Sequence, residues 1–239
     1  MDKARSDLLG KTDVKKALIS LAIPATIAMI VMGLYNLVDT IFVGQAVGED
    51  AIGGLSIAYP IQMIILAFAL MIGIGSASIF SRAYGRHDKE TMHRSVNTAL
   101  IMGFLFSALI SIFGFIFLDE LLIEFGAVGN NFGYAKDYLS IIFIGLIPFS
   151  LQVILNNLVR AEGRAKVAMI SMIIGAGANI ILDPIFIFDW GFNMGVEGAA
   201  LATVISRILA FIYVFVAALS KNSKLDIKLK NIYKIDIKM

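Results

Sequence analysis

Two carboxylates stand inside segments that are otherwise apolar, and they are the residues best suited to chemistry. Asp39 and Asp183 each lie near the end of a long apolar run. At the rise of a helix, each lies about 7 Å from the end of its run. Asn179 is one helical turn before Asp183 and shares its face, and Thr203 lies about 10 Å into a third run. Three segments therefore present two carboxylates, an amide and a hydroxyl at similar depth.

These four side chains offer hard oxygen ligands. Such ligands suit a small alkali cation such as sodium, or a proton held between two carboxylates. A carboxylate in an apolar span is costly, so a functional role is favoured over a helix-end carboxylate that reaches water. The sequence predicts a cation site at Asp39, Asn179, Asp183 and Thr203, and leaves proton and sodium both open.

Other polar side chains inside the apolar runs are candidates for lining a pathway or binding substrate. They are Tyr35, Asn36, Gln152 and Asn156. Gln152 and Asn156 share one helix face. The alternative role, that these groups tie helices together, stays open. Arg207 is in the middle of its run, where it would offset the carboxylates or face another helix.

The composition identifies the elements that must position these groups. The chain has 239 residues, 59% hydrophobic and only 16% charged, with a mean hydropathy of +0.85. A soluble domain carries about 25% charged residues. This excludes a soluble enzyme, a disordered chain and a nucleic-acid binder, and indicates an integral membrane protein. With no cysteine, the chain has no disulfide and no thiolate metal site.

Six apolar stretches are long enough to cross the bilayer as helices, which takes about 20 residues each. They are Ala17–Val43, Gly54–Arg82, Val96–Leu118, Tyr138–Arg160, Lys166–Phe188 and Val196–Leu219. Barrel strands would alternate in polarity, and these runs do not. The sequence predicts an all-α, polytopic protein with six transmembrane helices over residues 17–219. All four prolines (Pro24, Pro60, Pro148 and Pro184) lie inside these spans, where each can kink its helix.

Basic residues divide unequally between the two sides of the predicted bundle. Of the 20 Lys and Arg residues, 18 lie in the two tails and in the second-to-third and fourth-to-fifth connections, and Lys136 lies on the other side. By the positive-inside rule, residues 1–16 and 220–239 are cytoplasmic tails. In each of the two basic connections, which we call the basic corners, a glycine comes three residues after an arginine: Gly85 after Arg82, and Gly163 after Arg160. This pattern is typical of helix C-capping.

Five runs together resemble one family, the multidrug and toxic compound extrusion (MATE) transporters. They are Leu34-Tyr-Asn-Leu-Val-Asp39-Thr-Ile-Phe-Val-Gly44, Ala51-Ile-Gly-Gly-Leu-Ser56, Arg160-Ala-Glu-Gly163, Asn179-Ile-Ile-Leu-Asp183-Pro184, and Gly195-Val-Glu-Gly-Ala-Ala-Leu-Ala-Thr203. The resemblance implies an antiporter of the cytoplasmic membrane that exports drugs or other organic compounds against a proton or sodium gradient. It places the cation site in the first lobe, at the four residues already found by depth. The resemblance also implies that Tyr138 and Asn156 lie near that pocket.

The family has twelve helices in two lobes, whereas this chain has six. The resemblance therefore implies an N-terminal lobe whose partners are the bilayer, a small organic substrate and a second lobe. That second lobe is a missing C-terminal half or a second copy of the chain, and truncation is the favoured explanation. The basic tail from Lys221 resembles the start of an inter-lobe linker.

Two other functions are compatible with a six-helix membrane protein. A lipid-linked saccharide flippase of the same superfamily would carry several basic residues inside its spans, and only Arg207 does so here. A membrane enzyme, or a non-transporting binding subunit, is the other alternative. An enzyme needs acid, base or metal groups converging on a substrate, and no histidine or nucleophile accompanies the two aspartates. We expect no enzymatic activity, no cofactor and no nucleic-acid partner.

Overall fold

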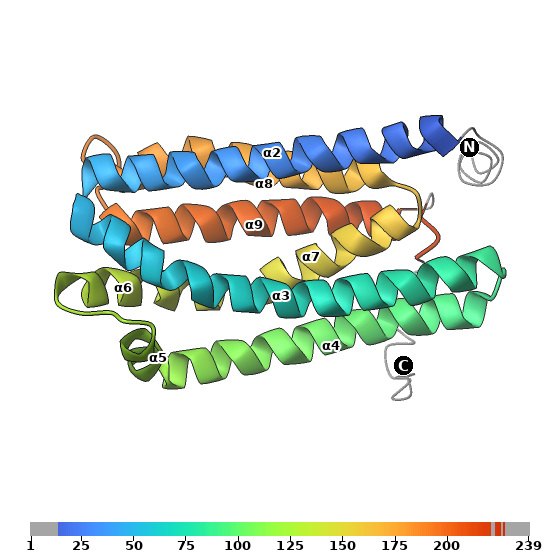
Figure 1. The fold of residues 1–239 in the computed structure, drawn as a ribbon, viewed down its shortest axis with the longest axis horizontal. Helices are drawn as coiled ribbons and strands as arrows, with labels where there is room; N and C mark the ends of the chain where they lie inside the picture. The colour runs from blue at the N-terminus through green and yellow to red at the C-terminus, as the bar shows by residue number, and fades with distance from the viewer. Residues whose placement is uncertain (1–13, 221–222, 226, 228–239) are drawn as a thin grey trace.

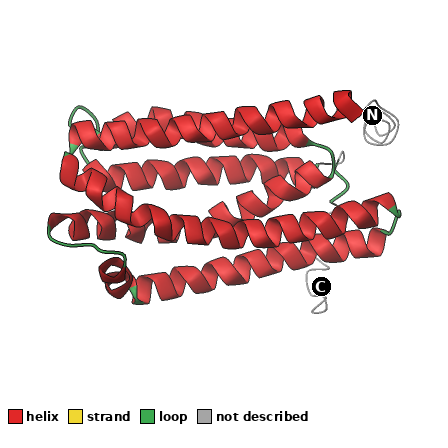
Figure 2. Ribbon diagram, viewed as in Figure 1, coloured by secondary structure: helices red, strands yellow, loops and turns green. Residues whose placement is uncertain are grey.

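A computed structural model describes residues 14–220, 223–225 and 227 of the chain. Within that part every regular element is a helix (Figures 1 and 2). The helices are α2 (Val14–Ala46), α3 (Glu49–Gly85), α4 (Lys89–Ile116), α5 (Leu118–Glu124), α6 (Asn130–Ile144), α7 (Leu146–Ala161), α8 (Ala165–Ile187) and α9 (Gly195–Leu219). The predicted tail over residues 1–16 and the one over 220–239 lie largely outside the described residues.

The helices confirm the all-α prediction and the number of spans. Five helices of the described chain are long and apolar enough to cross a membrane, and α6 with α7 makes a sixth span bent by 60°. Several helices, α3 and α4 among them, extend beyond the predicted apolar stretches, and at the start of α4 a polar side chain stabilises the added turn. In α4, Asp88 caps the N-terminus by accepting hydrogen bonds from Thr91 N at 3.1 Å and Thr91 Oγ1 at 2.6 Å. The short helix α5 was not predicted.

The sixth span is broken at a glycine and a proline. Pro148, in the first turn of α7, has no N–H to donate to the carbonyl of Ile144, so the series of helical backbone hydrogen bonds is interrupted there. Gly145 at the break packs so closely on Val204 of α9 that an added Cβ would lie 2.6 Å from a valine methyl. Pro24, Pro60 and Pro184 lie inside α2, α3 and α8, which continue as helices through them. The predicted kink is therefore confirmed at Pro148, where α6 and α7 meet at 60°.

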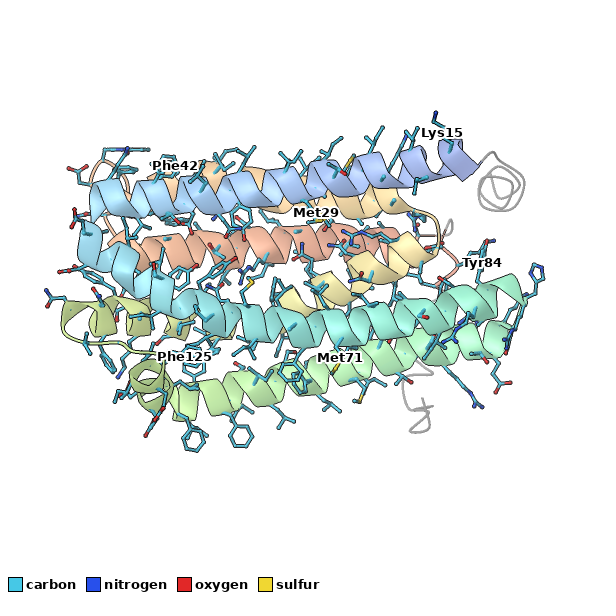
Figure 3. The ribbon with its side chains drawn as sticks, in the orientation of Figure 1. Lys15, Met29, Phe42, Met71, Tyr84 and Phe125 are labelled. Atoms are coloured by element: carbon cyan, nitrogen blue, oxygen red, sulfur yellow. The ribbon has the colours of Figure 1, made fainter. Side chains whose placement is uncertain are left out.

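The two ends of the bundle differ in charge. The α3–α4 and α7–α8 corners lie at the same end as the start of α2 and the end of α9 (Figure 1). Lys15 and Tyr84 mark this basic end, whereas Phe125 lies toward the opposite, acidic end (Figure 3). The acidic end carries Glu49, Asp50, Asp119, Glu120, Glu124, Asp137, Asp189 and Glu197. The helices thus bring together the charges that the sequence assigned to each side.

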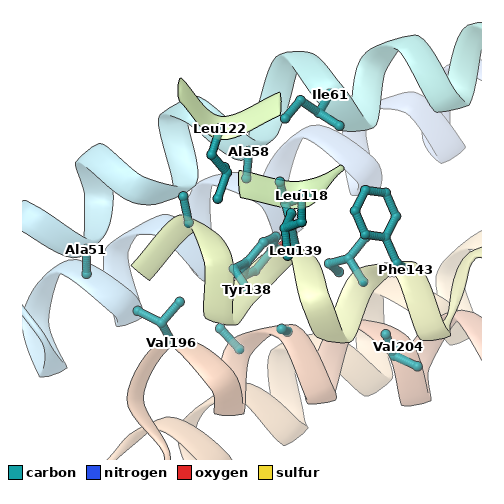
Figure 4. Close-up of a cluster of buried hydrophobic side chains, with 14 of the residues drawn as sticks. Ala51, Ala58, Ile61, Leu118, Leu122, Tyr138, Leu139, Phe143, Val196 and Val204 are labelled. Carbon is teal, nitrogen blue, oxygen red and sulfur yellow. The ribbon is translucent and has the colours of Figure 1, made fainter. Parts of the chain in front are cut away.

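Two apolar clusters hold the bundle together. The first joins α3, α5, α6 and α9 through buried side chains that include Leu118, Leu122, Tyr138, Phe143 and Val196 (Figure 4). The second joins α3, α4, α7, α8 and α9 nearer the basic end, through side chains that include Phe80, Ile154 and Val214. Large apolar side chains on the outer faces of α2 and α4 are exposed, as expected of helices that face lipid.

Candidate functional site

Three of the four predicted cation-site residues form one hydrogen-bonded group between α8 and α9. Asn179 Nδ2 donates to Asp183 Oδ1 at 2.8 Å and to Thr203 Oγ1 at 3.3 Å. Asp183 is fully buried, and the other two are at most 3% exposed. The spacing of one turn places Asn179 and Asp183 on one face of α8, and that face meets α9 at Thr203. The structure thus brings these three residues together.

Asp39 approaches this group from α2, which packs against α8. Its carboxylate is 6% exposed and interacts electrostatically with that of Asp183. In the described part of the chain Asp39 makes no hydrogen bond to the other three residues. Three buried oxygens, Asp39 Oδ1, Asn179 Oδ1 and Asp183 Oδ2, have no hydrogen-bond partner among the residues described. Buried polar atoms are normally paired, so these three oxygens are available for a ligand.

A cavity of about 300 Å³ opens beside Asp39, between α2, α3, α6 and α9. We call it the Asp39 cavity. Four predicted site residues besides Asp39 line it: Tyr35, Asn36, Tyr138 and Thr203. Residues of α3 that were not predicted, such as Tyr59 and Gln62, form the facing wall.

A second cavity, of about 260 Å³, continues toward the basic end, and we call it the Gln152 cavity. The predicted residues Gln152 and Asn156 line it from α7, and Asn179 lines it from α8. Tyr35, Leu66, Phe149, Thr203 and Arg207 line both cavities. All the predicted pathway residues therefore lie on two adjoining cavities.

Arg207 lies where the two cavities adjoin, where it contacts other helices and also interacts electrostatically with Asp39. Its Nη2 atom donates to Gln62 Oε1 at 3.1 Å. Its guanidinium carbon lies 4.3 Å from the centre of the Phe149 ring, a cation–π contact. Gln62 was missed in the sequence, although an amide inside an apolar run is the same kind of signal that identified Gln152.

The two basic corners differ in their backbone. At the α7–α8 corner Gly163 has a φ of +83°, as the capping interpretation predicted. At the α3–α4 corner Gly85 is the last helical residue and the positive φ, 56°, falls on His87, so the prediction for Gly85 was wrong. The reason is that Gly85 is still helical and Arg86 follows in helical conformation as the C-cap, so the turn falls two residues beyond Gly85.

A helical bundle with ionisable side chains and adjoining polar cavities inside its spans has the architecture of a secondary transporter. Comparison with known proteins gives the family. The model of the MatE family matches residues 24–185, and the chain belongs to this family. The resemblance seen in the sequence is thereby confirmed.

Relatives and solved structures agree with this assignment. The chain is 28% identical over 221 residues to the multidrug export protein MepA of Staphylococcus haemolyticus, covering 92% of this chain and 48% of that protein. It superimposes on a crystal structure of MATE in the bent conformation with a TM-score of 0.85 and 33% identity, over 95% of this chain and 50% of the other. An outward-facing multidrug resistance MATE transporter gives a TM-score of 0.86 and 33% identity, over 95% and 49%. The chain spans about half the length of the curated relatives it matches, which corresponds to one six-helix lobe.

Proposed function

We propose that this chain forms one lobe of a cation-coupled antiporter that exports drugs or other organic compounds across the cytoplasmic membrane. Membership of the MatE family and similarity to a multidrug export protein support the transport class. The concentration of Lys and Arg at the basic end supports an orientation with both chain ends on the cytoplasmic side. Because the relatives are about twice as long, we propose that a second six-helix lobe completes the pathway.

The observation that carries the ion-coupling proposal is the group of three unpartnered oxygens on Asp39, Asn179 and Asp183. Two carboxylates, an amide oxygen and the Thr203 hydroxyl would provide oxygen ligands for sodium. The same carboxylates would share a proton if the coupling ion is a proton. Either ion would relieve the repulsion between two buried acids on different helices.

Ion binding would drive transport only through a difference in affinity between two conformations. Asp39 belongs to α2 and Asp183 to α8, so an ion held between them would favour the conformation in which these helices approach. Substrate entering from the basic end would favour the other conformation. The ion would then promote substrate release, and substrate would promote ion release.

The test uses Trp190, the one tryptophan of the sequence, which stacks on Phe188 just beyond the end of α8. We expect sodium or acid titration of the chain in lipid nanodiscs to change its fluorescence. Asp39→Asn and Asp183→Asn should each abolish the change, because each removes a charge that the ion requires. Asp119→Asn, which alters an exposed carboxylate paired with Lys136 at 2.8 Å, is the matched control and should titrate normally.

Transport itself is measured in proteoliposomes that hold this lobe with the second lobe. An imposed sodium or proton gradient should drive efflux of a substrate dye, and both aspartate variants should lose that coupling. Normal gradient-driven efflux in both variants would refute the proposed site.

A further inference from the structure

We propose that the Gln152 cavity binds organic anions through Arg160 and Arg207. Both guanidinium groups line this cavity, and no Asp or Glu is among its lining residues. The Asp39 cavity differs, because there the same Arg207 is accompanied by a carboxylate. The inference names a substrate class for the lobe and rests on the proposed transport function for its physiological meaning.

Neither arginine is directly paired with a carboxylate among the described residues, and Arg207 interacts with Asp39 only electrostatically, without a hydrogen bond. Arg207 bonds to the neutral amide of Gln62 and stacks on Phe149. Arg160 Nη2 lies 3.3 Å from the sulfur of Met172. Within the described residues neither guanidinium has a carboxylate within 4.0 Å. An arginine inside a membrane span, as Arg207 is, is costly unless an anion accompanies it. Arg160 at the end of α7 adds a second positive charge to the same cavity, so the two together favour an anion there.

The rest of the wall specifies an amphipathic ligand. The amides of Gln152, Asn156 and Asn157 provide hydrogen-bonding groups beside the arginines. Most of the remaining surface is apolar and comes from Met29, Leu66, Leu70, Phe149, Val153 and Met172. A carboxylate, sulfonate or phosphate on a compact apolar body matches this distribution, with the acidic group held by planar, charge-assisted hydrogen bonds.

The position of the cavity fits loading from the basic end. Arg160 is in the last turn of α7, at the corner that the charge distribution assigns to the cytoplasmic side. Arg207 lies deeper, in the middle of α9. The anion site is separate from Asp39 and Asp183, so an anion and the coupling ion do not compete for one carboxylate. Exchange between them would therefore depend on the change of conformation.

The test compares three naphthalene probes of similar size that differ in charge: 2-naphthalenesulfonate, naphthalene-2-sulfonamide and 2-naphthylmethylammonium. Their binding to the 239-residue chain in phosphatidylcholine nanodiscs is measured by isothermal titration calorimetry. We expect the sulfonate to bind at least about ten-fold more tightly than either of the others, as a charge-assisted hydrogen bond implies. This comparison needs no variant. Equal or tighter binding of the ammonium probe would overturn the proposal.

Variants then identify the residues responsible. Arg207→Gln and Arg160→Gln should each weaken sulfonate binding about ten-fold or more and change sulfonamide binding by less than about two-fold. Arg207→Lys keeps the positive charge but loses the planar guanidinium group, so it should retain part of the affinity for the sulfonate. Arg86→Gln, which removes an exposed arginine at the same end, is the control and should leave sulfonate binding unchanged. Unaltered sulfonate binding in folded Arg207→Gln and Arg160→Gln proteins would refute the assignment.

Failure here is distinguishable from failure of the antiporter proposal. If the Trp190 titration depends on Asp39 and Asp183 while the sulfonate shows no preference, the ion site stands and the anion class is wrong. If the sulfonate depends on Arg207 while no ion response is found, the anion site stands and the coupling proposal is wrong.

Discussion

A pair of glycines in α3 allows a direct test of how closely the wall of the Asp39 cavity is packed. Gly54 faces α6, and a Cβ added there would lie 2.8 Å from Tyr134 Cβ and 2.9 Å from the backbone nitrogen of Ala135. Gly75, in the same helix, has nothing within 4 Å of an added Cβ. We therefore expect Gly54→Ala to destabilise the lobe relative to Gly75→Ala.

The magnitude follows from those distances. Ordinary van der Waals contact begins at 3.4 Å, so α3 and α6 must separate by roughly 0.5 Å to accept the methyl group, a cost of about 1–3 kcal/mol. Alanine also favours helix over glycine by about 1 kcal/mol, but that gain is common to both variants. Their difference therefore isolates the steric cost. At about 2–4 °C per kcal/mol for a chain of this size, Gly54→Ala should melt several degrees below Gly75→Ala.

The assay is thermal unfolding in detergent, followed by circular dichroism at the helix band. A second readout is ligand binding to the Asp39 cavity, because α6 also carries Tyr138, which lines it. Gly54→Ala should weaken that binding, and Gly75→Ala should not. Equal melting temperatures for the two variants would show that α3 and α6 are not in the close contact described.

Two further predictions concern the basic end. Glu162→Ala should lower stability by about 3–5 kcal/mol, because it leaves the buried guanidinium of Arg164, 3.6 Å away, without its carboxylate. Glu90→Ala, which breaks an exposed ion pair of 2.6 Å, should change the melting temperature much less. Hydrogen bonds from the Thr91 side chain and backbone lower the pKa of Asp88 from its ordinary value of 3.8. The Asp88 carboxylate therefore stabilises the folded protein above pH 3.8, and this stabilisation is lost as the pH falls through the lower pKa of the folded state. Asp88→Ala should therefore melt below the wild type at neutral pH, with the gap closing in stronger acid, whereas Asp88→Asn, which retains a capping oxygen, should melt close to the wild type.

The sequence predicted the helices well because crossing a bilayer imposes a simple requirement on composition. Apolar runs of about 20 residues must be helices, since no water is present to satisfy the backbone. The break in the sixth span was harder to predict. All four prolines lie inside apolar runs, but of the four only Pro148 lies at a break. There Gly145 also packs closely against Val204 of α9. A contact between segments so distant in the chain leaves no local pattern.

The candidate site was predictable to the extent that it depends on spacing and depth. Asn179 and Asp183 share a face because they are one turn apart, and Thr203 meets them because it lies at the same depth. The contact between Arg207 and Gln62 joins residues 145 positions apart. Neither residue specifies the other, so the sequence could identify Arg207 as unusual without naming its partner.

The two cavities of the lobe differ in the charged residues that line them. Arg207 lines both, but only the Asp39 cavity adds a carboxylate, and only the Gln152 cavity adds a second arginine. α2 contributes Asp39 to one cavity and Met29 to the other, and it packs mainly on α8, which carries Asp183. A shift of α2 caused by an ion between Asp39 and Asp183 would therefore alter the walls of both cavities at once. Ion and substrate could then affect each other without competing for a carboxylate.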